Sequence, residues 1–254
     1  MEDTYNLKKL KEDIYQFESI GKGSHLYLIM GDRINVLIDT GNYEKFNDFI
    51  AILVTELGLN IKDINLVINT HEHWDHISGN HYFKYKSIVA AHRFAATKIE
   101  LQDEFVIRAK ECDFDVKDLK TQIWLENNIL FDLGGDCHLK IFHTPGHTSG
   151  SISIFDPYRH FIFTGDTLFA NGYVSNIYES GSLADLINSL QTINTLRLEA
   201  LYPGHGPISK DPYSDINASI LGAKLKLDEY IKSIECSNPQ GRPTPSVYDR
   251  EQDK

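Results

Sequence analysis

Cysteine is scarce in this chain of 254 residues, which contains only Cys112, Cys137 and Cys236. A disulfide framework or a cysteine metal site needs cysteines that recur at short spacings, and these three are widely separated. We therefore interpret them as small, partly buried side chains. The sequence predicts no disulfide scaffold and no cysteine-based metal site.

Long apolar runs are also missing. No stretch approaches the roughly 20 apolar residues that a membrane-spanning helix requires. The first 15 residues are polar and of mixed charge, without the apolar core of a signal peptide. We expect a cytoplasmic protein with no membrane segment.

Positive charge is in short supply, because 25 lysines and arginines face 36 aspartates and glutamates, for a formal net charge of −11. Non-specific binding to nucleic acid depends mainly on basic side chains that displace counterions from phosphates. Nucleic acid is therefore a disfavoured partner. We expect a small-molecule substrate instead.

Histidine, in contrast, is concentrated in residues 71–76, which read HEHWDH. Neutral imidazoles and ionised carboxylates are ligands that a divalent cation such as zinc prefers. Residues 64–70 (INLVINT) predict a buried strand that ends directly before this motif. Alternate side chains of extended backbone point the same way, so His71 and His73 can converge on one ion. Asp75 and His76 then turn toward a second point, which suggests a second ion.

The apolar pattern predicts a mixed α/β domain. Antiparallel strands open it, and a strand-helix-strand unit with parallel strands leads into the motif, with Gly58 ending the helix. We expect strands at 12–20, 25–30, 34–39, 64–70, 87–91, 138–143, 151–155 and 160–164, and helices at 43–57, 78–83, around 183–190, and 213–235.

The length and the composition, 41% hydrophobic and 24% charged, fit one catalytic domain over residues 1–236. Residues 92–130 mix helical spacing with charge, and we predict a helical insertion that forms one wall of a substrate pocket. Residues 237–254 are polar and rich in proline, so we expect a tail outside the domain.

Three further ligand candidates lie in loops that follow apolar strands. His147 lies in HTPGHTSG, Asp166 in FTGDTLF and His205 in LYPGHGPI, each with a glycine nearby that lets the backbone come close. Loops at strand ends are where α/β folds place their chemistry. The remaining histidines have no other ligand candidates directly beside them in the sequence. We interpret them as exposed or hydrogen-bonded: His25, His81, His92, His138, His143 and His160. Among these, His143 is a candidate to support a metal ligand.

Together, these motifs resemble the metallo-β-lactamase superfamily of metal-dependent hydrolases over about residues 20–210. The resemblance implies an αββα sandwich, in which two mixed sheets carry helices on both outer faces and hold the metals at one edge. It assigns one ion to His71, His73 and His147, and a second to Asp75, His76 and His205, with Asp166 bridging both. Zinc is expected, and iron or manganese suit the same ligands.

The implied reaction is hydrolysis by a hydroxide held between the two ions. Coordination lowers the pKa of bound water to about 7, so no protein nucleophile is needed. We expect Asp75 to orient this nucleophile and to pass on its proton. Tyr173 and Tyr178 are candidates to bind or polarise a carbonyl, with packing against the pocket wall as the alternative, and we place Tyr178 in the catalytic set.

The substrate is less well defined by the motifs. TGDTLF (164–169) and YESG (178–181) resemble glyoxalase II thioesterases, although Asn176 stands near where those enzymes have a basic residue and residues 205–207 (HGP) replace their HEY. PGHGP also resembles β-lactamase-like ribonucleases, lactonases and esterases. We predict a dinuclear hydrolase of a carboxylic ester, thioester or lactone.

Three alternatives remain open at this stage. One is a phosphodiesterase or ribonuclease of the same fold, and another is a mononuclear iron enzyme of the persulfide dioxygenase type that uses His71, His147 and Asp166. The third is a non-enzymatic module that keeps its metals for structure. The sequence also leaves open the native metal and whether the protein forms a homo-oligomer.

Overall fold

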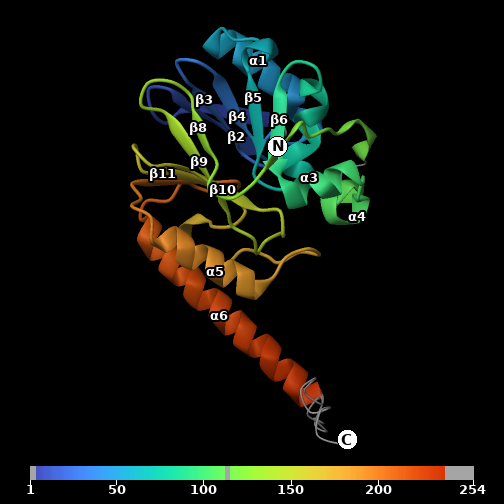
Figure 1. The fold of residues 1–254 in the computed structure, drawn as a ribbon, viewed down its shortest axis with the longest axis vertical. Coiled ribbons are helices and arrows are strands. Elements are labelled where there is room, and N and C mark those ends of the chain that lie inside the picture. The colour runs from blue at the N-terminus through green and yellow to red at the C-terminus, as the bar shows by residue number, and fades with distance from the viewer. Residues whose placement is uncertain (1–3, 112–114, 238–254) are drawn as a thin grey trace, which may run out of the picture.

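The computed structural model describes residues 4–111 and 115–237, and its strands form two sheets that face each other (Figure 1). In the first sheet, the strands from β1 to β4 pair antiparallel and those from β4 to β7 pair parallel. Its seven strands lie in chain order: β1 (Thr4–Lys9), β2 (Ile14–Ile20), β3 (Leu26–Met30), β4 (Asn35–Ile38), β5 (Leu66–Asn69), β6 (Ile88–His92) and β7 (Ile123–Leu125).

The second sheet has five strands and is also mixed, because only its edge pair β11 and β12 is parallel. Its order is β12 (Ala200–Pro203), β11 (Phe161–Gly165), β10 (Ile152–Asp156), β9 (His138–His143) and β8 (Leu130–Asp132). Alternation along the strands supplies the core between the sheets. In β3, Tyr27 and Ile29 belong to this core, whereas Leu26 and Leu28 face the opposite side.

Helices cover both outer faces. Phe49 and Leu53 of α1 (Phe46–Leu57) pack on the first sheet, and the left-handed Gly58, with φ 67°, ends this helix as predicted. The second sheet is covered by α5 (Leu183–Asn194) and α6 (Pro212–Ser237), and α6 extends well beyond the body of the molecule (Figure 1). The predicted αββα sandwich is therefore confirmed.

The structure differs from the expected elements mainly at sheet edges. β1, β7 and β8 were not predicted, because edge strands that expose much of their surface have a weak apolar pattern. The segment 92–130 contains the expected helices α3 (Arg93–Glu100) and α4 (Glu104–Ile107), but it also contains β7. Residues 78–83 form a 3₁₀ helix. Within the described residues, no helix is long and apolar enough to cross a membrane. Residues 238–254 of the predicted tail lie outside the described residues.

Candidate metal centre

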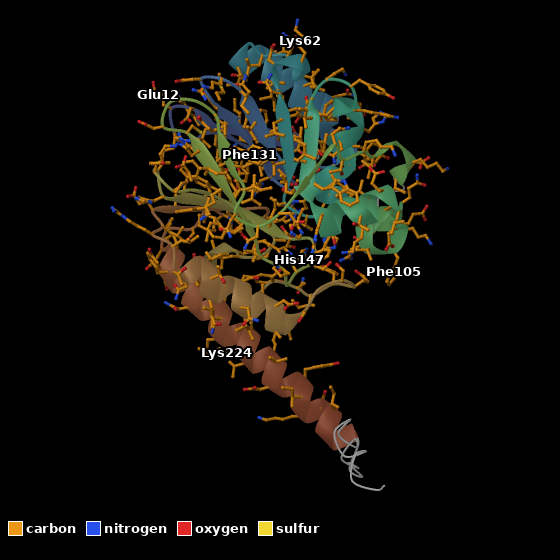
Figure 2. All side chains as sticks on the ribbon, in the orientation of Figure 1. Glu12, Lys62, Phe105, Phe131, His147 and Lys224 are labelled. Atoms are coloured by element: carbon orange, nitrogen blue, oxygen red, sulfur yellow. The ribbon has the colours of Figure 1, made fainter. Side chains whose placement is uncertain are left out.

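Four loops bring the predicted ligands to one edge of the two sheets. His71 and His73 follow β5, and Asp75 and His76 lie on α2 (Trp74–Ile77), which comes directly after them. The other three ligands follow β9, β11 and β12, which run in the same direction: His147, Asp166 and His205. His147 lies at this edge, on the side where α5 packs (Figure 2). The backbone approaches closely here, because a Cβ at Gly204 would collide with Asp166 and His76.

The first group of ligands is a set of three buried histidines. Nδ1 of His73 lies 3.1 Å from Nε2 of His71 and 2.9 Å from Nε2 of His147. The opposite nitrogen of His147, Nδ1, is 2.8 Å from the carbonyl oxygen of Asn176, to which it can donate. That bond leaves the lone pair of His147 Nε2 directed at the other two rings.

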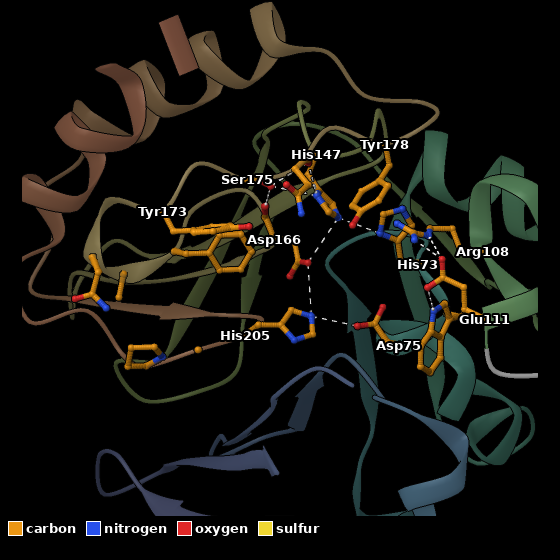
Figure 3. Close-up of a pocket in the computed structure, with 17 residues that line it drawn as sticks. His73, Asp75, Arg108, Glu111, His147, Asp166, Tyr173, Ser175, Tyr178 and His205 are labelled. Carbon is orange, nitrogen blue, oxygen red and sulfur yellow. Dashed lines mark hydrogen bonds and ion pairs between the residues drawn. The ribbon is translucent and has the colours of Figure 1, made fainter. Parts of the chain in front are cut away.

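The second group adds carboxylates. Nε2 of His205 lies 3.2 Å from Nε2 of His76 and 3.1 Å from Oδ2 of Asp75. Asp166 lies between the two groups (Figure 3), with Oδ1 3.3 Å from Nε2 of His76 and Oδ2 3.6 Å from Nε2 of both His147 and His205. One carboxylate therefore approaches ligand atoms of both groups.

The two groups differ in charge. Burial, together with the neighbouring histidines, lowers the pKa of His71 and His73 well below the usual value, so both rings are neutral. Burial also lowers the pKa of His76, but Asp166, Asp39 and Asp75 outweigh it and hold this pKa well above the usual value. Protons on the second group therefore balance its carboxylates, and a metal ion would supply the same positive charge.

The donor set fits metal ions. Three facing imidazole nitrogens cannot all be satisfied by one another, because each contact between two of them needs a shared proton. Oδ1 of Asp166 is buried and makes no well-formed hydrogen bond among the described residues, and its ion-pair neighbour is Nε2 of His76 at 3.3 Å. Three combinations have ligand atoms within 4.8 Å of one another: His71, His73 and His147; His71, His76 and Asp166; Asp75, His76 and His205. Histidine nitrogens and carboxylates in such combinations are a typical zinc environment.

Asp39, which the sequence reasoning did not select, orients ligands of both groups. Its Oδ2 lies 2.7 Å from Nδ1 of His76 and accepts a 2.8 Å hydrogen bond from Thr70 Oγ1, which lies 3.1 Å from Nδ1 of His71. Oδ1 accepts from the Thr70 amide at 2.7 Å. Asp39 directly follows β4 and adopts a φ of 59°, a left-handed backbone conformation that is uncommon outside glycine. A carboxylate that holds the opposite ring nitrogen fixes the tautomer of a metal-binding histidine.

We expect Asp39→Asn to weaken metal binding by about 10- to 100-fold, the usual cost of removing such a supporting group. The amide keeps the size of the side chain but loses the charge that orients His76. Competition titration with a chromogenic chelator measures the affinity. Asp228→Asn, the same change at an exposed position of α6, is the matched control, and equal affinities in the two variants would contradict the role of Asp39.

Glu72, between the first two histidines, is not one of the ligands but belongs to a buried network. It accepts hydrogen bonds from Lys98 Nζ at 3.0 Å, Thr148 Oγ1 at 2.9 Å and Ser180 Oγ at 3.2 Å. The Glu72 side chain is fully buried. It thereby ties the motif to α3, to the loop of His147 and to the segment of Tyr178.

A cavity of about 610 Å³ opens over the ligands, and His73, Asp75, His147, Asp166 and His205 form part of its wall. Tyr178 and Tyr173 both line it, as expected. The ring of Tyr178 lies edge-on to those of His73 and His147, with centroids 5.1 Å from each. Segment 92–130 contributes Arg108 and Glu111 to the wall.

Two of the six other histidines support the ligand loops. Nε2 of His143, the one named as a supporting candidate, lies 2.9 Å from the carbonyl oxygen of Ser149, two residues after His147. His25, which we interpreted as exposed or hydrogen-bonded, is buried and accepts from the Ser19 amide through Nδ1, while its Nε2 lies 2.8 Å from the Gly206 carbonyl oxygen. It therefore anchors the loop of His205, a role with no sequence signal.

The sequence matches a known family of proteins. Residues 20–205 match the sequence model of the metallo-β-lactamase superfamily. The chain belongs to this superfamily. A probable metallo-hydrolase of Methanocaldococcus jannaschii is 35% identical over 204 residues, which cover 77% of this chain and 93% of that one. The predicted family and enzyme class, a metal-dependent hydrolase, are thus confirmed.

Two other relatives of the chain carry more specific names. A hydroxyacylglutathione hydrolase of Pelagibacter ubique is 36% identical over 147 residues, 57% of this chain and 53% of that one. An acyl-coenzyme A thioesterase of Bos taurus is 25% identical over 231 residues, 79% of this chain and 81% of that one.

Solved structures of the superfamily share the fold. A metallo-β-lactamase family protein of Thermus thermophilus superposes with a TM-score of 0.72 at 20% identity, covering 87% of this chain and 82% of that one. The subclass B3 metallo-β-lactamase of Bradyrhizobium japonicum gives 0.71 at 19% identity, over 92% and 97%.

Proposed function

We propose that this protein is a dinuclear metal-dependent hydrolase that cleaves a thioester. The observation that carries the proposal is the position of Asp166, whose carboxylate approaches His147 of one ligand group and both His76 and His205 of the other. His71, His73 and His147 would hold one ion, and Asp75, His76 and His205 the second, with Asp166 shared. Zinc is the proposed metal, because imidazole and carboxylate ligands suit it.

Bound metal ions would supply a hydroxide at neutral pH and a Lewis acid for the carbonyl oxygen. The chain's own residues would orient the attacking water and bind the substrate. Asp75, hydrogen-bonded to His205 and with its pKa lowered to about 2 despite burial, is ionised and is our candidate to orient the attacking water. Tyr178, fixed beside His73 and His147, is our candidate to bind the substrate carbonyl.

The thioester is favoured among the three predicted acyl substrates. The relatives named hydroxyacylglutathione hydrolase and acyl-coenzyme A thioesterase support it. The cavity, at about 610 Å³, is in the range for small-molecule ligands and is large enough for an acyl chain and a thiol. Cytoplasmic location stays a prediction from the sequence.

Metal content and a substrate screen test this function together. We expect elemental analysis of protein purified without added metal to find close to two zinc ions per chain, and turnover to be fastest for thioesters among matched thioester, ester, lactone and phosphodiester substrates. One iron per chain with oxygen uptake and no hydrolysis would instead support the mononuclear dioxygenase. Preferential cleavage of phosphodiesters would support the nuclease, and bound metal without any turnover would support the structural module.

A further inference from the structure

We propose that Arg108 recognises an anionic oxyacid group, a carboxylate or a phosphate, on the thiol portion of the substrate. This inference rests on the proposed thioester hydrolysis and adds the feature that selects the substrate. Among the described residues that line the cavity, Arg108 is the only lysine or arginine. Within the described part of the chain, its guanidinium is therefore the one permanent cation that a bound substrate meets in the cavity.

The side chain of Arg108 is held in place beside the ligands. Its guanidinium carbon lies 3.9 Å from the centroid of the Tyr178 ring, and this ring in turn packs on His73 and His147 (Figure 3). The Tyr178 amide donates to the His147 carbonyl at 3.2 Å, which ties the ring to the ligand loop. Only one aromatic ring thus separates the cation from the proposed metal ligands.

The backbone directs Arg108 to this place. The residue ends α4 with φ 62° and ψ 34°, a left-handed conformation that arginine rarely adopts, and its amide bonds back to Phe105. Such conformations in non-glycine residues concentrate at ligand-binding positions. Here it lies in the segment that we expected to form a wall of the pocket.

A purely structural ion pair is the competing explanation. Glu111 accepts from both Nε and Nη2 of Arg108 through a single oxygen, Oε1. Arg108 also makes a side-chain hydrogen bond with Tyr178. A guanidinium has five N–H donors, so these two contacts still leave donors for a ligand. The Glu111 side chain is 46% exposed, and exposed pairs of this kind contribute little stability. The ion pair with Glu111 therefore orients the guanidinium, but its small contribution to stability does not explain why an arginine stands at this position.

The opposite wall indicates which part of the substrate carries the charge. Tyr173 lies across Asp166 from Arg108 (Figure 3), and Phe169 and Ala170 line the same cavity. This apolar wall suits an acyl chain. A scissile thioester over the ligands then places its thiol portion toward Tyr178 and Arg108.

Paired thioesters that differ only in charge test the inference. S-acetyl-3-mercaptopropionate is compared with its neutral amide, and S-acetyl-4′-phosphopantetheine with S-acetylpantetheine, by release of free thiol. Because a charge-assisted hydrogen bond to arginine is lost, Arg108→Gln should lower the anionic-to-neutral ratio of kcat/KM by about tenfold or more, mainly through KM. The pair with the larger wild-type ratio distinguishes a carboxylate from a phosphate.

Two variants control the result. Lys110→Gln removes the same charge from an exposed neighbour and should leave both ratios unchanged, whereas Arg108→Lys, which keeps a point charge, should retain part of the preference. A wild-type ratio near one in both pairs, or an unchanged ratio in Arg108→Gln, overturns the inference while the hydrolase stands. No turnover of any thioester by the metal-loaded wild type overturns both proposals together.

Discussion

Asp166→Asn should lose close to one metal ion per chain and lower kcat/KM for a thioester by at least about 100-fold, since removing Lewis-acid stabilisation costs several kcal/mol. Asparagine matches the shape of aspartate, but it lacks the charge that Nε2 of His76, His147 and His205 approach. Asp166 is ionised because those three histidines outweigh the effect of burial and lower its pKa well below the usual value. Elemental analysis and steady-state kinetics on the same preparation measure both effects.

The matched control is Asp156→Asn. Asp156 is a buried aspartate of the same sheet that lies at the opposite end of β11 from Asp166 and pairs with Arg159, with Nε to Oδ2 at 2.8 Å. Its loss should reduce thermal stability but leave the metal content at the wild-type value. Two ions per chain and wild-type turnover in Asp166→Asn would show that this carboxylate is not shared between them.

The ligand set was accessible from the sequence because its signals are local. Four of the seven residues lie within 71–76, and the others follow apolar strands beside glycines. The structure brings all seven together, while their assignment to individual ions stays a proposal. The apolar pattern predicted a mixed α/β domain, and the resemblance to the superfamily implied the αββα layers. Strands such as β3 and β5 do alternate between two apolar faces, and both faces are covered.

The supporting residues were not accessible because their contacts cross the chain. Asp39 meets Thr70 and His76 only because β4 and β5 pair in parallel, and its sequence signal is merely an aspartate after an apolar run. Nothing local distinguishes Arg108 from the chain's other basic residues. The partners of Glu72 come from positions 98, 148 and 180. Tertiary packing, and not periodicity, brings such residues together.

Glu72→Ala should lower the free energy of unfolding by about 3 kcal/mol, the lower end of the cost of breaking a buried ion pair. Glu72 is fully buried, whereas the Lys98 side chain is 17% exposed, so the ammonium left behind can reach water in part. For a domain of this size the melting temperature should fall by roughly 6–12 °C. Thermal unfolding of metal-loaded protein followed by circular dichroism measures the change.

A double-mutant cycle separates the ion pair from simple loss of packing. Lys98→Met alone leaves the buried carboxylate without its cation and should destabilise the protein at least as much as Glu72→Ala. The double variant should be clearly more stable than the sum of the two single changes, because neither partner is then left alone. Strict additivity would mean that Glu72 is held by Thr148 and Ser180 and that Lys98 contributes little. Because Glu72 joins the loops of His73, His147 and Tyr178, we also expect metal affinity to fall in Glu72→Ala at temperatures where it is fully folded.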